Sequence, residues 1–202
     1  MKIAIFIEPS SKDLKSISKW KNLIKENFGD QTYLDHPAHS TLALFNLKKK
    51  IDKSFFEKFK NKISLLKKFN IIISKPNIFY NDPISKGDTL HYSIKTNKKL
   101  INLQMIILNL FKKIEKNILK DQVYDNSKFN KNYKKYGFPF VGKDWIPHFT
   151  IASIKSNTEN KEKFIKKFLI DKILYKSFEV KFISIWLITS NTHKKIFEYH
   201  LK

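Results

Sequence analysis

The chain has 202 residues, of which 42% are hydrophobic and 14% aromatic, and its formal net charge is +22. This length fits one domain or two small lobes packed as one, and the apolar content is enough for a sizeable core, which argues against a disordered chain. Cysteine is absent, which excludes disulfides and thiolate metal sites. No apolar stretch reaches the roughly 18 residues of a membrane span. We therefore expect a cytoplasmic protein with no membrane partner.

The first half of the chain alternates short apolar runs, typical of strands, with amphipathic segments, typical of helices. In chain order we expect a strand at 2–8, a helix at 11–29, a strand at 40–47, a helix at 52–69 and strands at 70–81 and 88–95. Gly29 should end the first helix. Pro76 has no N–H to donate within a sheet, so its strand should bulge or lie at a sheet edge there.

The second half repeats this order after a long helix, which we expect from about Lys98 to Lys120. The remaining expected elements are a strand at 148–154, a helix at 160–173, a long strand at 177–190 and a last strand at 194–202. Residues 121–146 show no clear period. Long irregular segments are often functional or mobile, so we expect a flap-like insert here, beside strand 148–154, and the most mobile long segment of the chain.

Two His-x-Thr sequences lie at matching places in this repeat, in AHSTLALF (38–45) and PHFTIASI (147–154). Phe69 and Phe178, which open strands in the two halves, each follow the motif histidine of their half by 30 residues. A two-unit repeat favours a single domain, 1–202, made of two related lobes of about 1–95 and 96–202, which can interleave strands and close on a shared cleft. We expect both motif strands near the centres of their sheets.

The motif residues have the chemistry that cleavage of a phosphodiester requires. Residues two apart on a strand face the same way, so His39 projects with Thr41, and His148 with Thr150. Two imidazoles can divide proton transfer between a general base and a general acid, while threonine hydroxyls donate hydrogen bonds to phosphate oxygens. Such a reaction needs no metal, and we expect neither a metal site nor a cofactor.

The other imidazole and aromatic side chains carry weaker signals. We interpret the remaining histidines as partly exposed residues of turns and closing strands, although any of them could line the cleft; they are His36, His91, His193 and His200. Trp145 and the aromatic residues of 133–140 could stack on a base or pin the flap-like insert to the body, and the sequence does not decide between these roles.

The net charge has two interpretations that the sequence leaves open. A strongly basic chain fits a polyanionic partner such as RNA. However, all 40 basic residues are lysine, and a composition rich in Lys, Asn and Ile also fits the codon bias of an A+T-rich genome. Because arginine is absent, no guanidinium fork is available for phosphate recognition, and those contacts fall to lysine and the backbone.

The duplicated motif resembles that of the 2H phosphoesterase superfamily, and the chain is similar to its RNA-ligase-like, 2′,3′-cyclic phosphodiesterase branch. The resemblance implies an α+β fold of two pseudo-symmetric lobes, each with antiparallel strands and helices packed outside, and an active-site cleft between the lobes. It implies that His39 and His148 are catalytic and that Thr41 and Thr150 bind the phosphate.

The resemblance also implies hydrolysis of a 2′,3′-cyclic phosphate or a 2′-5′ phosphodiester without metal, with RNA ends or small nucleotides as substrates. We expect the protein to be a monomer. Two alternatives stay open. One is a phosphodiesterase for a small cyclic oligonucleotide signal, and the other is a non-catalytic RNA-binding protein on the same fold. Two complete motifs count against the second alternative.

Overall fold

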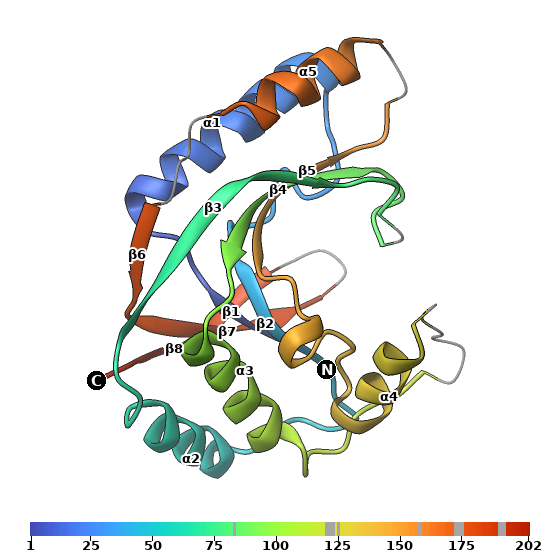
Figure 1. Ribbon diagram of the computed structural model, residues 1–202. Helices are drawn as coiled ribbons and strands as arrows, with labels where there is room; N and C mark the ends of the chain where they lie inside the picture. The colour runs from blue at the N-terminus through green and yellow to red at the C-terminus, as the bar shows by residue number, and fades with distance from the viewer. Residues whose placement is uncertain (83, 120–123, 125, 157–158, 172–175, 190–192) are drawn as a thin grey trace.

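Two four-stranded antiparallel sheets form the centre of the computed structural model, which describes residues 1–82, 84–119, 124, 126–156, 159–171, 176–189 and 193–202 (Figure 1). The first sheet has the strand order β2 (Ser40–Asn46), β1 (Lys2–Ile7), β7 (Phe182–Ile188), β8 (His193–His200). The second has the order β5 (His148–Ile154), β4 (Asp88–Lys95), β3 (Phe69–Phe79), β6 (Lys176–Val180). The expected α+β architecture of two antiparallel lobes is confirmed.

The two halves of the chain exchange strands between the sheets. β3 comes from the first half and pairs with β4 and β6, whereas β7 comes from the second half and pairs with β1 and β8. The single long strand expected at 177–190 is therefore wrong. Only Lys181 separates β6 from β7, and these two strands belong to different sheets because the chain passes there from one lobe to the other.

The described part of the chain contains five α-helices. They are α1 (Ser11–Phe28), α2 (Lys53–Ile63), α3 (Lys98–Phe111), α4 (Ser127–Tyr136) and α5 (Glu159–Leu169), and a short 3-10 helix covers Gly142–Asp144. α1 and α5 lie side by side over the second sheet, and Trp20 of α1 packs edge-on against Phe164 and Phe168 of α5 (Figure 1). α2 and α3 contact strands of the first sheet, β8 and β2 respectively.

Local sequence explains where most of these helices begin and end. The carboxylate of Asp52 caps α2 by accepting a hydrogen bond from the Phe55 N–H (2.8 Å), and Asn97 caps α3 in the same way through the Leu100 N–H (2.8 Å). Gly29 follows α1 at φ 68°, a left-handed conformation that glycine adopts without strain, so it ends that helix as expected.

Three of the expected helices end earlier in the structure, and one of them is α5, which ends at Leu169 instead of 173. α2 ends at Ile63 instead of 69, and α3 ends at Phe111 instead of Lys120, which itself lies outside the described residues. Tertiary contacts account for the difference in α3, because the chain after Phe111 hydrogen-bonds with the end of β2. The Asn117 N–H donates to the Asn46 carbonyl (2.6 Å), and the Lys48 N–H donates to the Glu115 carbonyl (3.2 Å).

The segment 121–146 is less irregular than its sequence suggested, since it contains α4. The helix sequence SKFNKNYKKY is mostly polar and has one buried residue, Tyr136, which is why its apolar period is weak. Part of the segment, at 121–123 and 125, lies outside the described residues, and its mobility stays a prediction. Trp145 is buried (5% exposed), which fits anchoring to the body and not base stacking.

The motif strands lie at sheet edges, so the expectation of central positions is wrong. β2 is the first strand of one sheet and β5 is the first strand of the other, and the two strands contact each other. An edge has one side free of a partner strand, which lets the two lobes approach through their motifs.

The bulge expected at Pro76 is confirmed, because the pairing of β3 with β4 shifts register between Ile73 and Pro76. Among the helices in the described ranges, none is long and apolar enough to cross a bilayer.

Candidate active site

The first motif presents one face of β2 to the space between the sheets. His39 and Thr41 are half-buried, whereas their neighbours Ser40 and Leu42 are fully buried on the opposite face. The His39 Nδ1–H donates to the carbonyl oxygen of Pro37 (2.6 Å), and the imidazole stacks on Phe6 with ring centroids 3.7 Å apart. A carbonyl can only accept, so the Nδ1 proton is fixed and Nε2 of the neutral ring carries the free lone pair.

The second motif repeats this arrangement on β5. His148 and Thr150 are half-buried, Phe149 is fully buried on the other face, and the His148 Nδ1–H donates to the carbonyl of Ile146 (2.7 Å). Each motif histidine is thus anchored to the carbonyl two residues before it, and each leaves Nε2 for another partner.

The correspondence between the lobes extends to single residues. Thr41 pairs with Phe6 across β1 and β2, and Thr150 pairs with His91 across β4 and β5. Both pairings shift register at the same place, so that Leu42 in one strand and Ile151 in the other have no partner opposite. A bulge re-aims the side chains beside it, and here the same bulge follows the threonine of each motif.

One position breaks this symmetry, because the second lobe has His91 where the first has Phe6. His91 is fully buried and stacks on Phe79 with centroids 4.0 Å apart, and His148 stands edge-on to both rings at 5.0 Å. Its Nδ1–H donates to the Thr89 carbonyl (3.2 Å), and its Nε2 has no hydrogen-bond partner among the described residues. No local pattern in the sequence indicates this placement, and the expectation of a partly exposed His91 is wrong.

Burial controls the protonation of all three imidazoles. Desolvation lowers the pKa of His39 to about 3, against the opposing effect of the Pro37 carbonyl, and lowers the pKa of His91 to about 3. Desolvation also lowers the pKa of His148. A charge on His148 lowers the pKa of His39 further, and the two motif strands contact each other. In the free protein both rings are therefore neutral at pH 7.

The charges around the two motifs have opposite signs. After desolvation and the opposing effect of the Pro37 carbonyl, the smaller influences on the pKa of His39 include a downward effect of the Lys21 ammonium. The Asp82 carboxylate instead raises the pKa of His148 against the larger effect of burial. Asp82 is held in place by hydroxyl groups, since Thr89 donates to it (2.7 Å) and Ser85 donates to it (3.1 Å).

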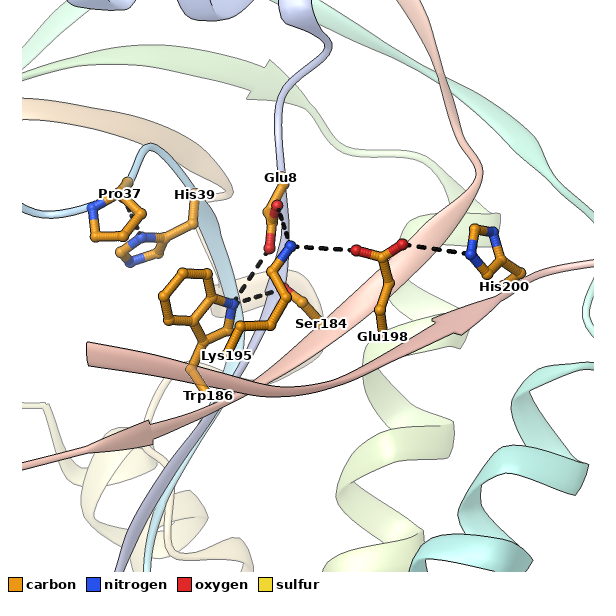
Figure 2. Close-up of polar contacts among 8 residues, drawn as sticks. All are labelled: Glu8, Pro37, His39, Ser184, Trp186, Lys195, Glu198 and His200. Carbon is orange, nitrogen blue, oxygen red and sulfur yellow. Dashed lines mark hydrogen bonds and ion pairs between the residues drawn. The ribbon is translucent and has the colours of Figure 1, made fainter.

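A polar network lies beside His39 of the first motif (Figure 2). Its Trp186 ring contacts Phe6, with centroids 6.1 Å apart. The Trp186 indole N–H donates to Glu8 (3.2 Å) and to the Ser184 hydroxyl (2.8 Å), and the Lys195 ammonium pairs with Glu8 (2.8 Å) and with Glu198 (3.1 Å). With two carboxylates as partners, Lys195 is a poor candidate for binding a substrate phosphate.

No group of three or more His, Asp or Glu side chains in the described part of the chain is placed to hold a metal ion. A sequence model of the 2′-5′ RNA ligase superfamily matches residues 8–194, which is most of the chain and includes both motifs. The chain belongs to the 2′-5′ RNA ligase superfamily.

Solved structures agree with this superfamily in fold. The chain is similar to TT0787 of Thermus thermophilus, with a TM-score of 0.65 and 9% identity over 99% of this chain and 97% of that chain. It is similar to a phosphoesterase (TM-score 0.55, 11% identity, 99% and 97% covered) and to E. coli LigT complexed with 3′-AMP (TM-score 0.53, 10% identity, 99% and 97% covered). At these identities the likeness shows the fold alone. No curated protein sequence matches the chain.

The remaining histidines of this 2′-5′ RNA ligase superfamily protein differ from one another. His36 and His193 are half-buried and contact each other with ring centroids 4.2 Å apart, close to the first motif. His200 is exposed and pairs with Glu198 at the other end of β8 (3.3 Å). His36, His193 and His200 fit the expectation of partly exposed histidines. His36 and His193 also form a contact between the loop before the first motif and the start of β8.

His91 gives this superfamily member a testable dependence of stability on pH. The folded-state pKa is about 3, and an unfolded histidine titrates near 6.5. Between these values the unfolded chain binds a proton that the folded chain does not, so this residue lowers the free energy of unfolding by about 1.4 kcal/mol for each pH unit below 6.5.

We therefore expect His91→Phe, which copies the first lobe, to be more stable relative to the wild type at pH 5 than at pH 7.5. Urea unfolding at both pH values measures this difference, and His200→Phe on the exposed end of β8 is the matched control. A His91→Phe difference that is the same at both pH values would contradict a neutral, buried His91.

Proposed function

We propose that this protein is a metal-independent phosphodiesterase that hydrolyses a 2′,3′-cyclic phosphate or a 2′-5′ phosphodiester in RNA or nucleotides. The observation that carries the proposal is the matched anchoring of His39 and His148. In both rings the Nδ1 proton is held by a backbone carbonyl, so both Nε2 atoms are available to a substrate, and each has the hydroxyl of Thr41 or Thr150 on the same strand face.

The proposed reaction divides proton transfer between the two imidazoles. The Nε2 of one neutral ring accepts a proton from a water molecule while the water oxygen forms a bond to phosphorus. The bond from phosphorus to the leaving ribose oxygen breaks, and the protonated second ring gives its Nε2 proton to that oxygen. Thr41 and Thr150 donate hydrogen bonds to the non-bridging oxygens, where negative charge resides in the transition state.

The protonated ring in this scheme depends on the substrate. Burial keeps both imidazoles neutral in the free protein. A phosphate between them brings a negative charge within a few ångströms, and an opposite charge at that distance raises the pKa of an imidazole. Substrate binding would thus supply the charged acid that the free protein lacks, and no metal ion is needed for this step.

The nucleotide class of substrate has support from the relatives. LigT of E. coli has been crystallised with 3′-AMP and also with ATP, at TM-scores of 0.53 and 0.54 to this chain. A small cyclic oligonucleotide would present the same phosphodiester, and it remains the alternative substrate. RNA binding without catalysis is the other alternative, but it gives no reason for two matched imidazoles with free Nε2 atoms.

The experiment that tests the proposal is hydrolysis in the presence of EDTA. We expect turnover of a nucleoside 2′,3′-cyclic phosphate or a 2′-5′-linked dinucleotide at the same rate with and without the chelator. Activity that is lost in EDTA and restored by a divalent metal would mean that the histidines are ligands, and would refute the mechanism. A cyclic dinucleotide in the same substrate panel tests the first alternative, and RNA binding without turnover of any substrate would favour the second.

A further inference from the structure

A cavity of about 430 Å³ lies next to the first motif and is formed by the loop of residues 31–37 and by His193. We call it the loop cavity. Small-molecule sites in proteins usually measure about 300–1,000 Å³, so its size suits a nucleoside. None of the four motif residues lines it, and the proposed chemistry does not use it.

Three rings form a continuous row in the wall of the loop cavity. Tyr33 contacts His36 edge-on with centroids 5.2 Å apart, and His36 contacts His193 at 4.2 Å. All three side chains are half-buried, so each combines fixed packing with an accessible surface. Burial, followed by the charges of His193 and Lys21, lowers the pKa of His36 and keeps that ring neutral. Neutral aromatic rings are the surfaces on which nucleobases stack.

The loop that carries these rings is held rigidly by one lysine. The Lys21 ammonium donates to the carbonyl oxygens of Tyr33 (2.8 Å), Leu34 (2.8 Å) and His36 (2.5 Å), which uses all three of its protons. The backbone of Tyr33 is held at φ 74°, a conformation that residues other than glycine rarely adopt. Such strain persists only where the surrounding structure imposes it, and it is concentrated at ligand sites. The wall of the cavity is thus formed before any ligand arrives.

The loop cavity is connected to both motifs. Pro37 lines the cavity, and its carbonyl oxygen accepts the Nδ1–H bond that orients His39. On the other side, the charge of Asp82 acts on the Tyr33 hydroxyl and also on His148. A ligand in the cavity would therefore lie beside the residue whose carbonyl orients His39.

We propose that the loop cavity binds the nucleobase of the substrate nucleotide, by stacking against the row of Tyr33, His36 and His193. This inference rests on the proposed phosphodiesterase function, and it identifies the substrate as a nucleoside phosphodiester that is recognised through its base as well as its phosphate. Because stacking tolerates every base, the site would bind nucleobases in general with modest preference among them.

The test compares two substrates that differ only in the base. Adenosine 2′,3′-cyclic phosphate has the base, and the 2′,3′-cyclic phosphate of methyl riboside has none. We expect His36→Ala and His193→Ala each to lower the preference for the adenosine substrate, measured as the ratio of the two kcat/KM values, by about tenfold, which is the typical effect of losing one stacking ring. His200→Ala, on the exposed end of β8, is the control and should leave the ratio unchanged. A ratio that does not change in His36→Ala and His193→Ala would overturn the proposal.

A binding experiment separates this proposal from the proposed catalysis. Calorimetric titration with 3′-AMP and with inorganic phosphate requires no turnover. We expect 3′-AMP to bind the wild type more tightly than phosphate does, and His36→Ala to remove about tenfold of that advantage. Equal affinities of the wild type for the two ligands, or an advantage that persists in His36→Ala, would show that the cavity does not take the base. Absence of turnover with intact base-dependent binding would refute the catalytic function and leave the cavity assignment standing.

Discussion

Alanine in place of His39 or of His148 should lower kcat for a 2′,3′-cyclic nucleotide by about 10²–10⁴-fold, the usual contribution of one positioned proton-transfer group. Each substitution removes an Nε2 atom that the anchored Nδ1–H leaves free for the substrate. The loss should appear mainly in kcat, because proton transfer occurs in the transition state and not in substrate binding.

The double variant distinguishes a catalytic pair from two independent residues. If one imidazole takes a proton while the other gives one, the reaction cannot use either ring alone, so the double variant should be little slower than the slower single variant. Losses that multiply would mean that the two rings act separately. His200→Ala is the control for a general effect of removing a histidine, and a circular dichroism spectrum of each variant shows whether it folds. Full activity in either single variant would refute the assignment.

The parts of the site that sequence could predict are those set by local geometry. The period of two along a strand places His39 with Thr41 and His148 with Thr150, and burial confirms it, since Ser40 and Phe149 are buried on the opposite faces. The duplication itself was visible, because both motifs precede apolar strands. The two related lobes followed from the repeated order of strands and helices, and the α+β fold class followed from the resemblance to the 2H phosphoesterase superfamily.

The parts that sequence could not predict depend on pairing between distant segments. Nothing local in KSFEVKFISIWLI shows that the chain changes sheets at Lys181, because no glycine, proline or other turn residue separates the two strands. The edge positions of β2 and β5 are likewise a property of sheet order. His91 is the clearest case, because its match to Phe6 appears only through the pairing of each residue with a motif threonine. The segment between β4 and β5 contains both α3 and α4, so His91 lies farther from His148 along the chain than Phe6 lies from His39. Spacing in the sequence therefore conceals the match between His91 and Phe6.

The threonine hydroxyls should matter less than the imidazoles, and the matched substitutions are valine and serine. Thr41→Val and Thr150→Val keep the β-branched shape that fits a strand and remove only the hydroxyl, so packing changes little. Each should lower kcat by up to about 10²-fold, because one hydrogen bond to a charged transition-state oxygen is lost. Thr41→Ser and Thr150→Ser keep the hydroxyl and should stay within a few-fold of the wild type.

The two threonines need not respond equally, because their cross-strand neighbours differ. Thr41 lies opposite the apolar ring of Phe6, whereas Thr150 lies opposite His91, whose Nε2 has no partner among the described residues. Serine at position 150 is free to rotate its hydroxyl toward that lone pair and away from the phosphate, since serine lacks the methyl group that restricts threonine. We therefore expect Thr150→Ser to lose more activity than Thr41→Ser, and His91→Phe to reduce the difference between them. Steady-state kinetics of the four single variants and of the Thr150→Ser/His91→Phe double variant measure this. Valine variants that are as active as the serine variants would show that the hydroxyls do not bind the reacting phosphate.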